Sequence, residues 1–165
     1  MKLLDKRKRP FFSVVIPTLN EEDWLPNLLS DLKNQTYKEF EVIVVDGNSR
    51  DRTKIAAGKF KKIIPNLKII NSNIRNVSAQ RNLGAKLARG QYLLFVDADS
   101  GLPAFFLEGI KYRIESSQAE VFSTWCQADS QRNADKVIAH DREELAIPRP
   151  SSWYPPSFNI TRAKD

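Results

Sequence analysis

Two aspartates, Asp97 and Asp99, follow directly on an apolar run from Tyr92 to Val96. A run of large apolar residues that ends in charge is typical of a buried parallel strand. In open α/β sheets, ligands bind outside the carboxyl ends of such strands. Two carboxylates that lie close together repel each other unless they share a cation or a proton. The pattern therefore predicts a bound metal ion.

Other polar residues follow the earlier apolar runs. Asp46 ends the second run, and the polar segment 17–21 ends the first. Because carboxyl ends of parallel strands meet at one edge, we expect both to converge with Asp97 and Asp99. Carboxylates favour Mg²⁺ or Mn²⁺ as the bound ion. These ions keep some of their waters and also bind phosphate oxygens, so we expect a nucleoside diphosphate as the ligand at this edge of the sheet. A single strand-terminal aspartate more often caps the next turn, and for Asp46 both roles stay open.

The elements that must position these residues alternate between strands and helices. This alternation predicts βαβ units and a mostly parallel sheet, which is the α/β class. Asp23 is expected to cap the first helix, and Gly90 to cap the end of the third. The expected strands are 11–16, 41–45, 67–70, 91–96 and 120–125, and the expected helices are 24–32, 51–60, 76–88, 103–115 and 133–145, with a proline-rich loop over 147–156.

Composition and charge narrow the class of protein. The chain has 165 residues, 41% hydrophobic and 28% charged, which is typical of one globular domain. We expect a basic arm over 1–10 and a folded domain over 11–165. The formal net charge is +6, and five basic residues against Asp5 place +4 of it in the arm, so no broad basic face for nucleic acid is predicted. The arm is interpreted as a solvated tail, with attraction to anionic lipid headgroups as the alternative.

The cysteine content, the N-terminus and the glycine pattern indicate the cellular compartment and exclude some cofactors. Cys126 is the single cysteine, which excludes an intrachain disulfide and a cysteine-built metal site. Charged residues interrupt the N-terminus before a signal-peptide core could form, and no apolar stretch approaches the roughly 20 residues of a membrane helix. These features predict a cytoplasmic location, with peripheral association at the cytoplasmic face of a membrane as the alternative. No Gly-x-Gly-x-x-Gly follows the first strand, which disfavours a Rossmann dehydrogenase.

Five motifs, in order, resemble those of family 2 glycosyltransferases with the GT-A fold. The resemblance covers about residues 11 to 125. It implies a Rossmann-like nucleotide-diphospho-sugar transferase architecture, a nucleotide-sugar donor and a divalent metal. It further implies transfer with inversion at the anomeric carbon to a hydroxyl of a glycan or lipid-linked acceptor, as in cell-envelope polysaccharide synthesis. The motifs are Val14–Glu22, Gln35–Tyr37, Val44–Thr53, Ala79–Gly84 and Gly90–Asp99.

The resemblance implies a nucleoside site at the ends of the first two strands. A proline-led turn leaves backbone groups free to meet a base edge, and a carboxylate accepts two donors from a uracil imide or a ribose diol. The backbone of the turn and one glutamate would hold the nucleoside, while the residues after the second strand would contact the base or ribose. The residues are Pro17, Thr18, Leu19, Glu21, Asp46 and Asn48.

The resemblance also implies roles at the diphosphate. Arg81 would lie near it, where the planar guanidinium suits phosphate oxygens. Asp97 would approach the ribose or a metal-bound water, and Asp99 would coordinate the metal. The metal would stabilise the charge that develops on the departing diphosphate.

The sequence departs from the family pattern in three places. After Asp46 the family often has a second acid or a Gly-Gly pair, and here Gly47-Asn48 stands instead. Arg52 replaces a frequent glycine. The segment Ser157–Arg162 resembles the strand and turn that precede the family's Glu-Asp motif, and no such motif follows in this sequence. We therefore identify no catalytic base, interpret the chain as truncated at its C-terminus, and expect little sugar transfer from it alone.

Two other function classes remain as alternatives. The first is a non-catalytic fragment that binds a nucleotide sugar. The second is a phosphotransferase of the haloacid dehalogenase type, because those enzymes also place Asp-x-Asp at a strand end. The second is disfavoured, since they carry the motif on their first strand, whereas Asp97 follows three earlier strands.

Overall fold

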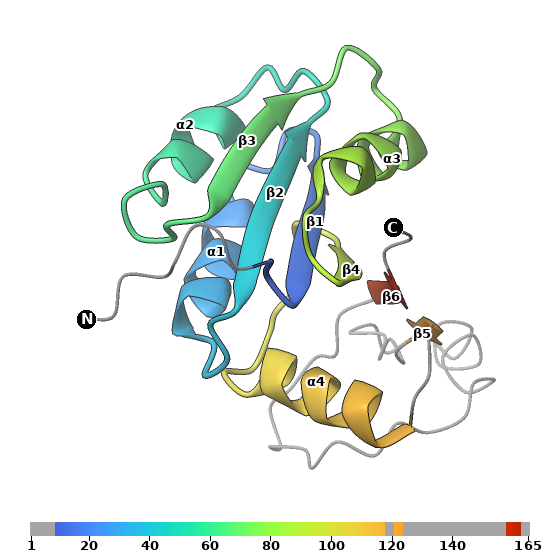
Figure 1. The fold of residues 1–165 in the computed structure, drawn as a ribbon. Coiled ribbons are helices and arrows are strands. Elements are labelled where there is room, and N and C mark those ends of the chain that lie inside the picture. The colour runs from blue at the N-terminus through green and yellow to red at the C-terminus, as the bar shows by residue number, and fades with distance from the viewer. Residues whose placement is uncertain (1–8, 118–120, 124–157, 163–165) are drawn as a thin grey trace, which may run out of the picture.

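The computed structural model describes residues 9–117, 121–123 and 158–162. These residues form a six-stranded sheet with helices packed on it (Figure 1). The elements are β1 (Phe12–Thr18), α1 (Leu25–Asn34), β2 (Phe40–Asp46), α2 (Thr53–Gly58), β3 (Leu67–Asn71), α3 (Val77–Leu87), β4 (Tyr92–Val96), α4 (Phe106–Ser117), β5 (Val121–Ser123) and β6 (Phe158–Arg162). The predicted helix 133–145 and loop 147–156 lie outside the described residues.

The sheet has the strand order β3-β2-β1-β4-β6-β5. Strands β1 to β4 are parallel, whereas β6 runs antiparallel to both β4 and β5. The predicted mostly parallel α/β fold is confirmed. The chain builds outward from β1 to β3 and then returns to place β4 on the other side of β1. The junction between β1 and β4 is therefore the switch point at which open α/β sheets bind ligands.

Apolar side chains cover both faces of the sheet. Every residue of β1 and β2 is buried. Central parallel strands are covered on both faces, which accounts for their near-continuous apolar sequences. On one face, the buried leucines of α1 join Ala57 of α2 and apolar residues of α4 in the main core. On the other face, Leu83 of α3 packs against a smaller cluster that contains Val15 and Val45. The contacts on this second face hold α3 against β1 and β2.

A glycine allows α3 to approach the sheet closely. A Cβ atom built on Gly84 would lie 2.3 Å from Cγ1 of Val15, so a larger residue would push the helix outward. Gly90 has a similar role, because its Cβ would lie 2.5 Å from the backbone nitrogen of Ser13. The prediction that Gly90 caps α3 is wrong, since Ala88 is the C-cap residue. Close packing accounts for Gly90.

The predicted N-cap of α1 is also wrong. Trp24 occupies the cap position, and no side chain caps the helix there. The reason is that the preceding turn continues into the helix, with the Leu25 amide donating to the Glu21 carbonyl at 3.0 Å. Backbone bonding thus replaces the role predicted for Asp23. None of the helices in the described part of the chain is long and apolar enough to cross a bilayer.

A buried carboxylate, Glu41, fastens β2 to the segment between α3 and β4. It accepts hydrogen bonds from the Ser13 hydroxyl at 2.7 Å and the Arg89 amide at 2.6 Å. The ammonium group of Lys68 lies 3.0 Å from its other oxygen. Burial alone would raise the pKa of Glu41, but these hydrogen bonds and the Lys68 charge outweigh it and lower the pKa below its ordinary value.

The lowered pKa predicts a loss of stability in acid. The folded chain favours the ionised form of Glu41 more strongly than the unfolded chain does. The ionised carboxylate therefore contributes to the free energy of unfolding above about pH 4.3, the unfolded pKa. This contribution is lost as the pH falls through the lower folded pKa. We expect Glu41→Leu to lower the free energy of unfolding at pH 7 by about 3 kcal/mol, because Ser13 and Arg89 lose a buried acceptor. Urea unfolding at pH 7 and pH 4 measures both effects. A variant as stable as the wild type, with the same acid sensitivity, would contradict this role.

Candidate functional site

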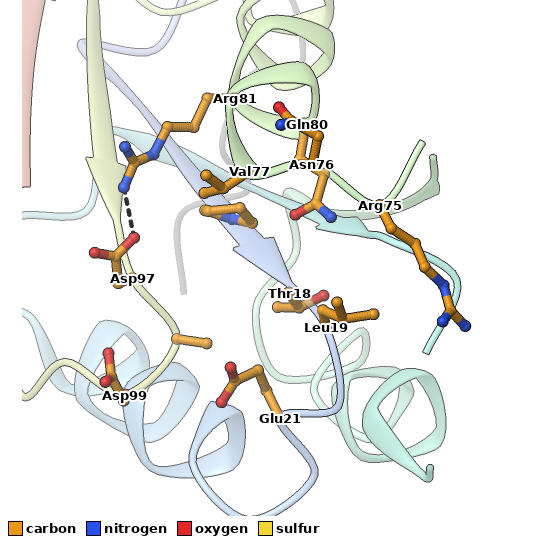
Figure 2. Close-up of a pocket in the computed structure, with 12 residues that line it drawn as sticks. Thr18, Leu19, Glu21, Arg75, Asn76, Val77, Gln80, Arg81, Asp97 and Asp99 are labelled. Atoms are coloured by element: carbon orange, nitrogen blue, oxygen red, sulfur yellow. Dashed lines mark hydrogen bonds and ion pairs between the residues drawn. The ribbon is translucent and has the colours of Figure 1, made fainter. Parts of the chain in front are cut away.

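A cavity of about 450 Å³ opens at the switch point between β1 and β4 (Figure 2). Three segments supply its walls: the end of β1 with the following turn, the start of α3, and the residues after β4. The carboxyl ends of parallel strands thus meet where the sequence predicts a site. The lining residues are Pro17, Thr18, Leu19, Glu21, Arg75, Asn76, Val77, Gln80, Arg81, Asp97, Ala98 and Asp99.

Three carboxylates give one end of this cavity a negative charge. In Figure 2, Glu21 points from the β1 turn towards the segment that carries Asp97 and Asp99. Burial, and then the nearby charges of Asp99, Asp51 and Asp97, raise the pKa of Glu21 above its ordinary value. The Asp99 side chain is exposed to solvent. This end of the cavity is suited to a cation.

A guanidinium group faces one of these carboxylates. Nη2 of Arg81, on α3, lies 2.6 Å from Oδ1 of Asp97 (Figure 2). Nε of the same side chain is buried and has no hydrogen-bond partner in the described part of the chain. A buried N–H without an acceptor costs about 1–3 kcal/mol, and an anionic oxygen bound in the cavity could relieve that cost. Arg81 thus places an anion-binding group beside the acidic end.

The structure places Asp46 and Asn48 outside the lining of this cavity. The Asp46 carboxylate is buried and accepts a hydrogen bond from the Ser49 amide at 2.9 Å, with Nζ of Lys54 3.8 Å away. It therefore caps its own turn, which was the alternative role. Asp46 thus does not join Asp97 and Asp99 in the lining of the cavity. Among the described residues, no group of three or more histidine, cysteine or carboxylate side chains could hold a metal ion, and the assignment of a metal to Asp97 and Asp99 stays a prediction.

Asn48 has a backbone role in the same turn. Its φ angle of 65° is left-handed, which asparagine tolerates better than most residues. Its carbonyl accepts a hydrogen bond from Nη2 of Arg75 at 2.9 Å, which links the turn to the start of α3. The base contact predicted for Asn48 stays a prediction.

Comparison with known proteins places this architecture in a family. The model of the family "Glycosyl transferase family 2" matches residues 13–163. The chain belongs to this family. Its sequence is 39% identical over 92 residues to the poly(ribitol-phosphate) beta-N-acetylglucosaminyltransferase TarS of Staphylococcus aureus, covering 53% of this chain and 16% of TarS. It is 30% identical over 132 residues to the GalNAc(5)-diNAcBac-PP-undecaprenol beta-1,3-glucosyltransferase of Campylobacter jejuni, covering 79% and 42%.

Solved structures agree with this membership. The S. aureus TarS 1-349 structure in complex with UDP has a TM-score of 0.66 and 32% identity, covering 73% of this chain and 37% of that one. The mannosyltransferase PcManGT of Pyrobaculum calidifontis, in complex with GDP-Man and Mn²⁺, has a TM-score of 0.64 and 25% identity, with the same coverage. The GT-A architecture is confirmed. This family 2 chain spans about two fifths or less of the length of these relatives.

Five lining residues of this family 2 chain were not predicted from the sequence: Ala98 after β4, and four residues near the start of α3. Asn76 caps the helix by accepting from the Ala79 amide at 3.0 Å. Gln80 lies so close to Gly47 that a Cβ there would be 2.0 Å from its Nε2 atom, so the glycine after Asp46 makes room for it. These residues follow the carboxyl end of β3, and that position in the sequence could have indicated that they lie near the site. The four residues near α3 are Arg75, Asn76, Val77 and Gln80.

Helix α1 holds the segment that follows Asp99. Nε2 of Gln35 donates to the Pro103 carbonyl at 2.7 Å, and its Oε1 accepts from the Leu107 amide at 3.0 Å. Oδ2 of Asp31 accepts from the Leu102 amide at 2.9 Å. The Gln-Thr-Tyr motif of the family thus positions the chain behind the acidic end of the cavity.

We expect Gln35→Leu to lower the free energy of unfolding by about 2 kcal/mol, because a buried donor and a buried acceptor in residues 103–107 lose their partners. Gln35→Glu is the matched control: it keeps the acceptor for the Leu107 amide and should have the smaller effect at a pH where it is protonated. Urea unfolding measures both variants. Equal stability of wild type and Gln35→Leu would show that water replaces the carboxamide.

Proposed function

We propose that this domain binds the nucleotide-sugar donor of a glycosyltransferase. The enzyme would move the sugar from a nucleoside diphosphate to an acceptor hydroxyl, with inversion at the anomeric carbon. The observation that carries the proposal is the pairing of Arg81 with Asp97 in a cavity that Asp99 also lines. An anion-binding group beside carboxylates suits a ligand that brings phosphate and a cation together. The solved complexes of TarS with UDP-GlcNAc and of PcManGT with GDP-Man support a nucleotide-sugar ligand.

A divalent cation fits the donor groups at the acidic end. Asp99, with Asp97, would hold Mg²⁺ or Mn²⁺, since these ions need only one or two protein carboxylates when phosphate oxygens and waters complete the set. When bound, the ion would stabilise negative charge on the departing diphosphate. Arg81 would bind the same diphosphate through its N–H groups. The Mn²⁺ in the PcManGT complex supports this assignment.

The nucleoside would lie towards the β1 turn. The Pro17 to Leu19 backbone forms this wall, and Leu19 offers a partly exposed apolar surface to a base. Arg75 lies at the opposite end of the cavity from Asp99 in Figure 2. Asp46 would act by shaping the turn after β2 unless the nucleoside displaces one of its present partners. The acceptor is proposed to be a glycan or lipid-linked molecule, and the location the cytoplasmic side of a membrane.

A second candidate is a donor-binding module without transfer activity. It is favoured by one observation: among the described residues, none after Asp99 lines the cavity, so the described part of the chain adds no later acidic group there to act as base on an acceptor hydroxyl. Formation of labelled glycoside from a labelled nucleotide sugar and a membrane lipid extract would distinguish the two candidates.

Isothermal titration with UDP and with GDP tests donor binding. We expect the chain to bind one of the two diphosphates with Mn²⁺ present and at least tenfold more weakly with excess chelator, because Asp97 and Asp99 would then face the phosphates without a shared cation. Uridine and guanosine serve as controls, since they lack the diphosphate and should not respond to the metal. Equal affinity with metal and with chelator would refute the metal's role, and the absence of binding to either diphosphate would refute the function.

A further inference from the structure

The segment from α2 to β3 has one buried side and one exposed side. Its inward residues recur at spacings of four, three and four: Thr53, Ala57, Phe60 and Ile64, all buried or packed against the core. The turns after α2 keep a helical course, because the Phe60 amide donates to Ala57 and the Ile64 amide donates to Phe60. Residues at intermediate positions must therefore face away from the core.

The outward residues combine lysines with exposed aliphatic side chains. Ile55 is 65% exposed and Ile63 is 47% exposed, and Lys59, Lys61 and Lys62 are all exposed. Ile55, Lys59 and Lys62 follow a helical spacing of four and three, and Lys61 and Ile63 flank Lys62 in the exposed turn. We call these five residues the α2 patch. In Figure 1, α2 and the turns that follow it lie at the β3 edge of the sheet, and no residue of the patch lines the cavity.

The positive charge of this region is not balanced locally. From Arg52 to Ile70 the sequence has six basic residues and no acidic one. Two of them, Lys54 and Lys68, pair with the buried carboxylates Asp46 and Glu41. The three lysines of the α2 patch make no ion pair with any residue that the structure describes. They are available to a negatively charged partner.

We propose that the α2 patch docks on an anionic lipid surface. Lysines next to an anionic leaflet are attracted to its headgroups, and aliphatic side chains between them can insert at the boundary with the acyl chains. Nucleic acid would use the lysines but would gain little from two isoleucines, because its contacts with proteins are mainly polar. The pairing of charge with exposed isoleucine therefore favours a bilayer. The site goes beyond the proposed transfer activity and does not depend on it.

Sedimentation with lipid vesicles tests the site. The full chain should bind phosphatidylcholine vesicles that contain phosphatidylserine, and should bind pure phosphatidylcholine vesicles far more weakly. Because each lysine near an anionic leaflet contributes about fivefold, replacing Lys59, Lys61 and Lys62 with glutamine should weaken binding by roughly a hundredfold. Ile55→Ser with Ile63→Ser should weaken it further by removing the aliphatic contact. All five side chains are exposed, and thermal unfolding checks that the variants remain folded.

Matched controls show whether vesicle binding depends on the α2 patch, on net charge alone or on the N-terminal arm. Glutamine at Lys33, Lys38 and Lys86, which are exposed elsewhere, removes the same charge and should change binding far less. Equal loss in both triple variants would overturn the proposal, since net charge alone would then be responsible. So would a loss confined to replacement of Lys6, Arg7 and Lys8 in the N-terminal arm. Tighter binding to single-stranded RNA than to the vesicles, unaffected by the isoleucine changes, would assign the lysines to nucleic acid instead.

Discussion

Asp99→Asn is expected to abolish the divalent-cation dependence of diphosphate binding. The amide keeps the size of the side chain but removes the charge that Mg²⁺ or Mn²⁺ needs, and Asp97 already shares one oxygen with Arg81. We expect the affinity for UDP or GDP in the presence of Mn²⁺ to fall by about a hundredfold, which is about 2.8 kcal/mol. The remaining affinity should equal that of the wild-type chain in excess chelator. Isothermal titration with and without Mn²⁺ measures all four values.

Asp46→Asn is the matched control for this experiment. Its carboxylate is buried in the turn after β2, so its replacement should act on the turn and on nucleoside affinity while leaving the response to Mn²⁺ intact. Uridine or guanosine, titrated into the same variants, separates the nucleoside contribution from that of the diphosphate. If both variants lost the Mn²⁺ response equally, separate roles for Asp46 and Asp99 would be refuted. If Asp99→Asn kept the response, another group would hold the cation.

The difference between Asp46 and Asp97 shows how far sequence pattern carries. Both follow apolar runs, and that pattern correctly predicted two buried parallel strands. Asp46, however, is the last residue of β2 and pairs with Thr18 on one side and Asn71 on the other. Asp97 comes one residue after β4 ends, and it lines the cavity, where it pairs with Arg81. A shift of one residue relative to the strand end separates the carboxylate that lines the cavity from the one that does not, and strand ends are the least certain part of a sequence prediction.

Contacts between distant segments were beyond sequence reasoning for a different reason. Strand identity depends on local pattern, and β1 to β4 were predicted from it. Strand order depends on which apolar faces pack together, so the antiparallel insertion of β6 beside β4 had no local signal. The hydrogen bond from Arg75 to the Asn48 carbonyl joins residues 27 positions apart, and that between Gln35 and Leu107 joins residues 72 apart. Spacing within a motif cannot indicate such partners.

Arg81→Met is expected to weaken diphosphate binding while sparing the nucleoside. The guanidinium group supplies charged N–H donors, and hydrogen bonds to charged groups contribute about 1.5–3 kcal/mol each. One such contact predicts a loss of roughly 10- to 150-fold in affinity for UDP or GDP. Uridine or guanosine should bind the variant and the wild type equally. Arg81→Lys should restore only part of the affinity, because an ammonium group keeps the charge but lacks the planar pair of donors. Titration of each ligand measures these differences.

Asp97→Asn tests whether Arg81 and Asp97 act as one unit. In excess chelator, the Asp97 carboxylate repels the diphosphate and occupies one nitrogen of Arg81, 2.6 Å away. The asparagine variant should therefore bind the diphosphate more tightly than the wild type without metal, yet gain less from Mn²⁺. In the double variant with Arg81→Met, the increase in metal-free diphosphate affinity should be smaller, because no guanidinium group remains to bind the phosphate. Additive effects of the two substitutions would show that Arg81 and Asp97 contact the ligand independently, since residues that share a partner do not add.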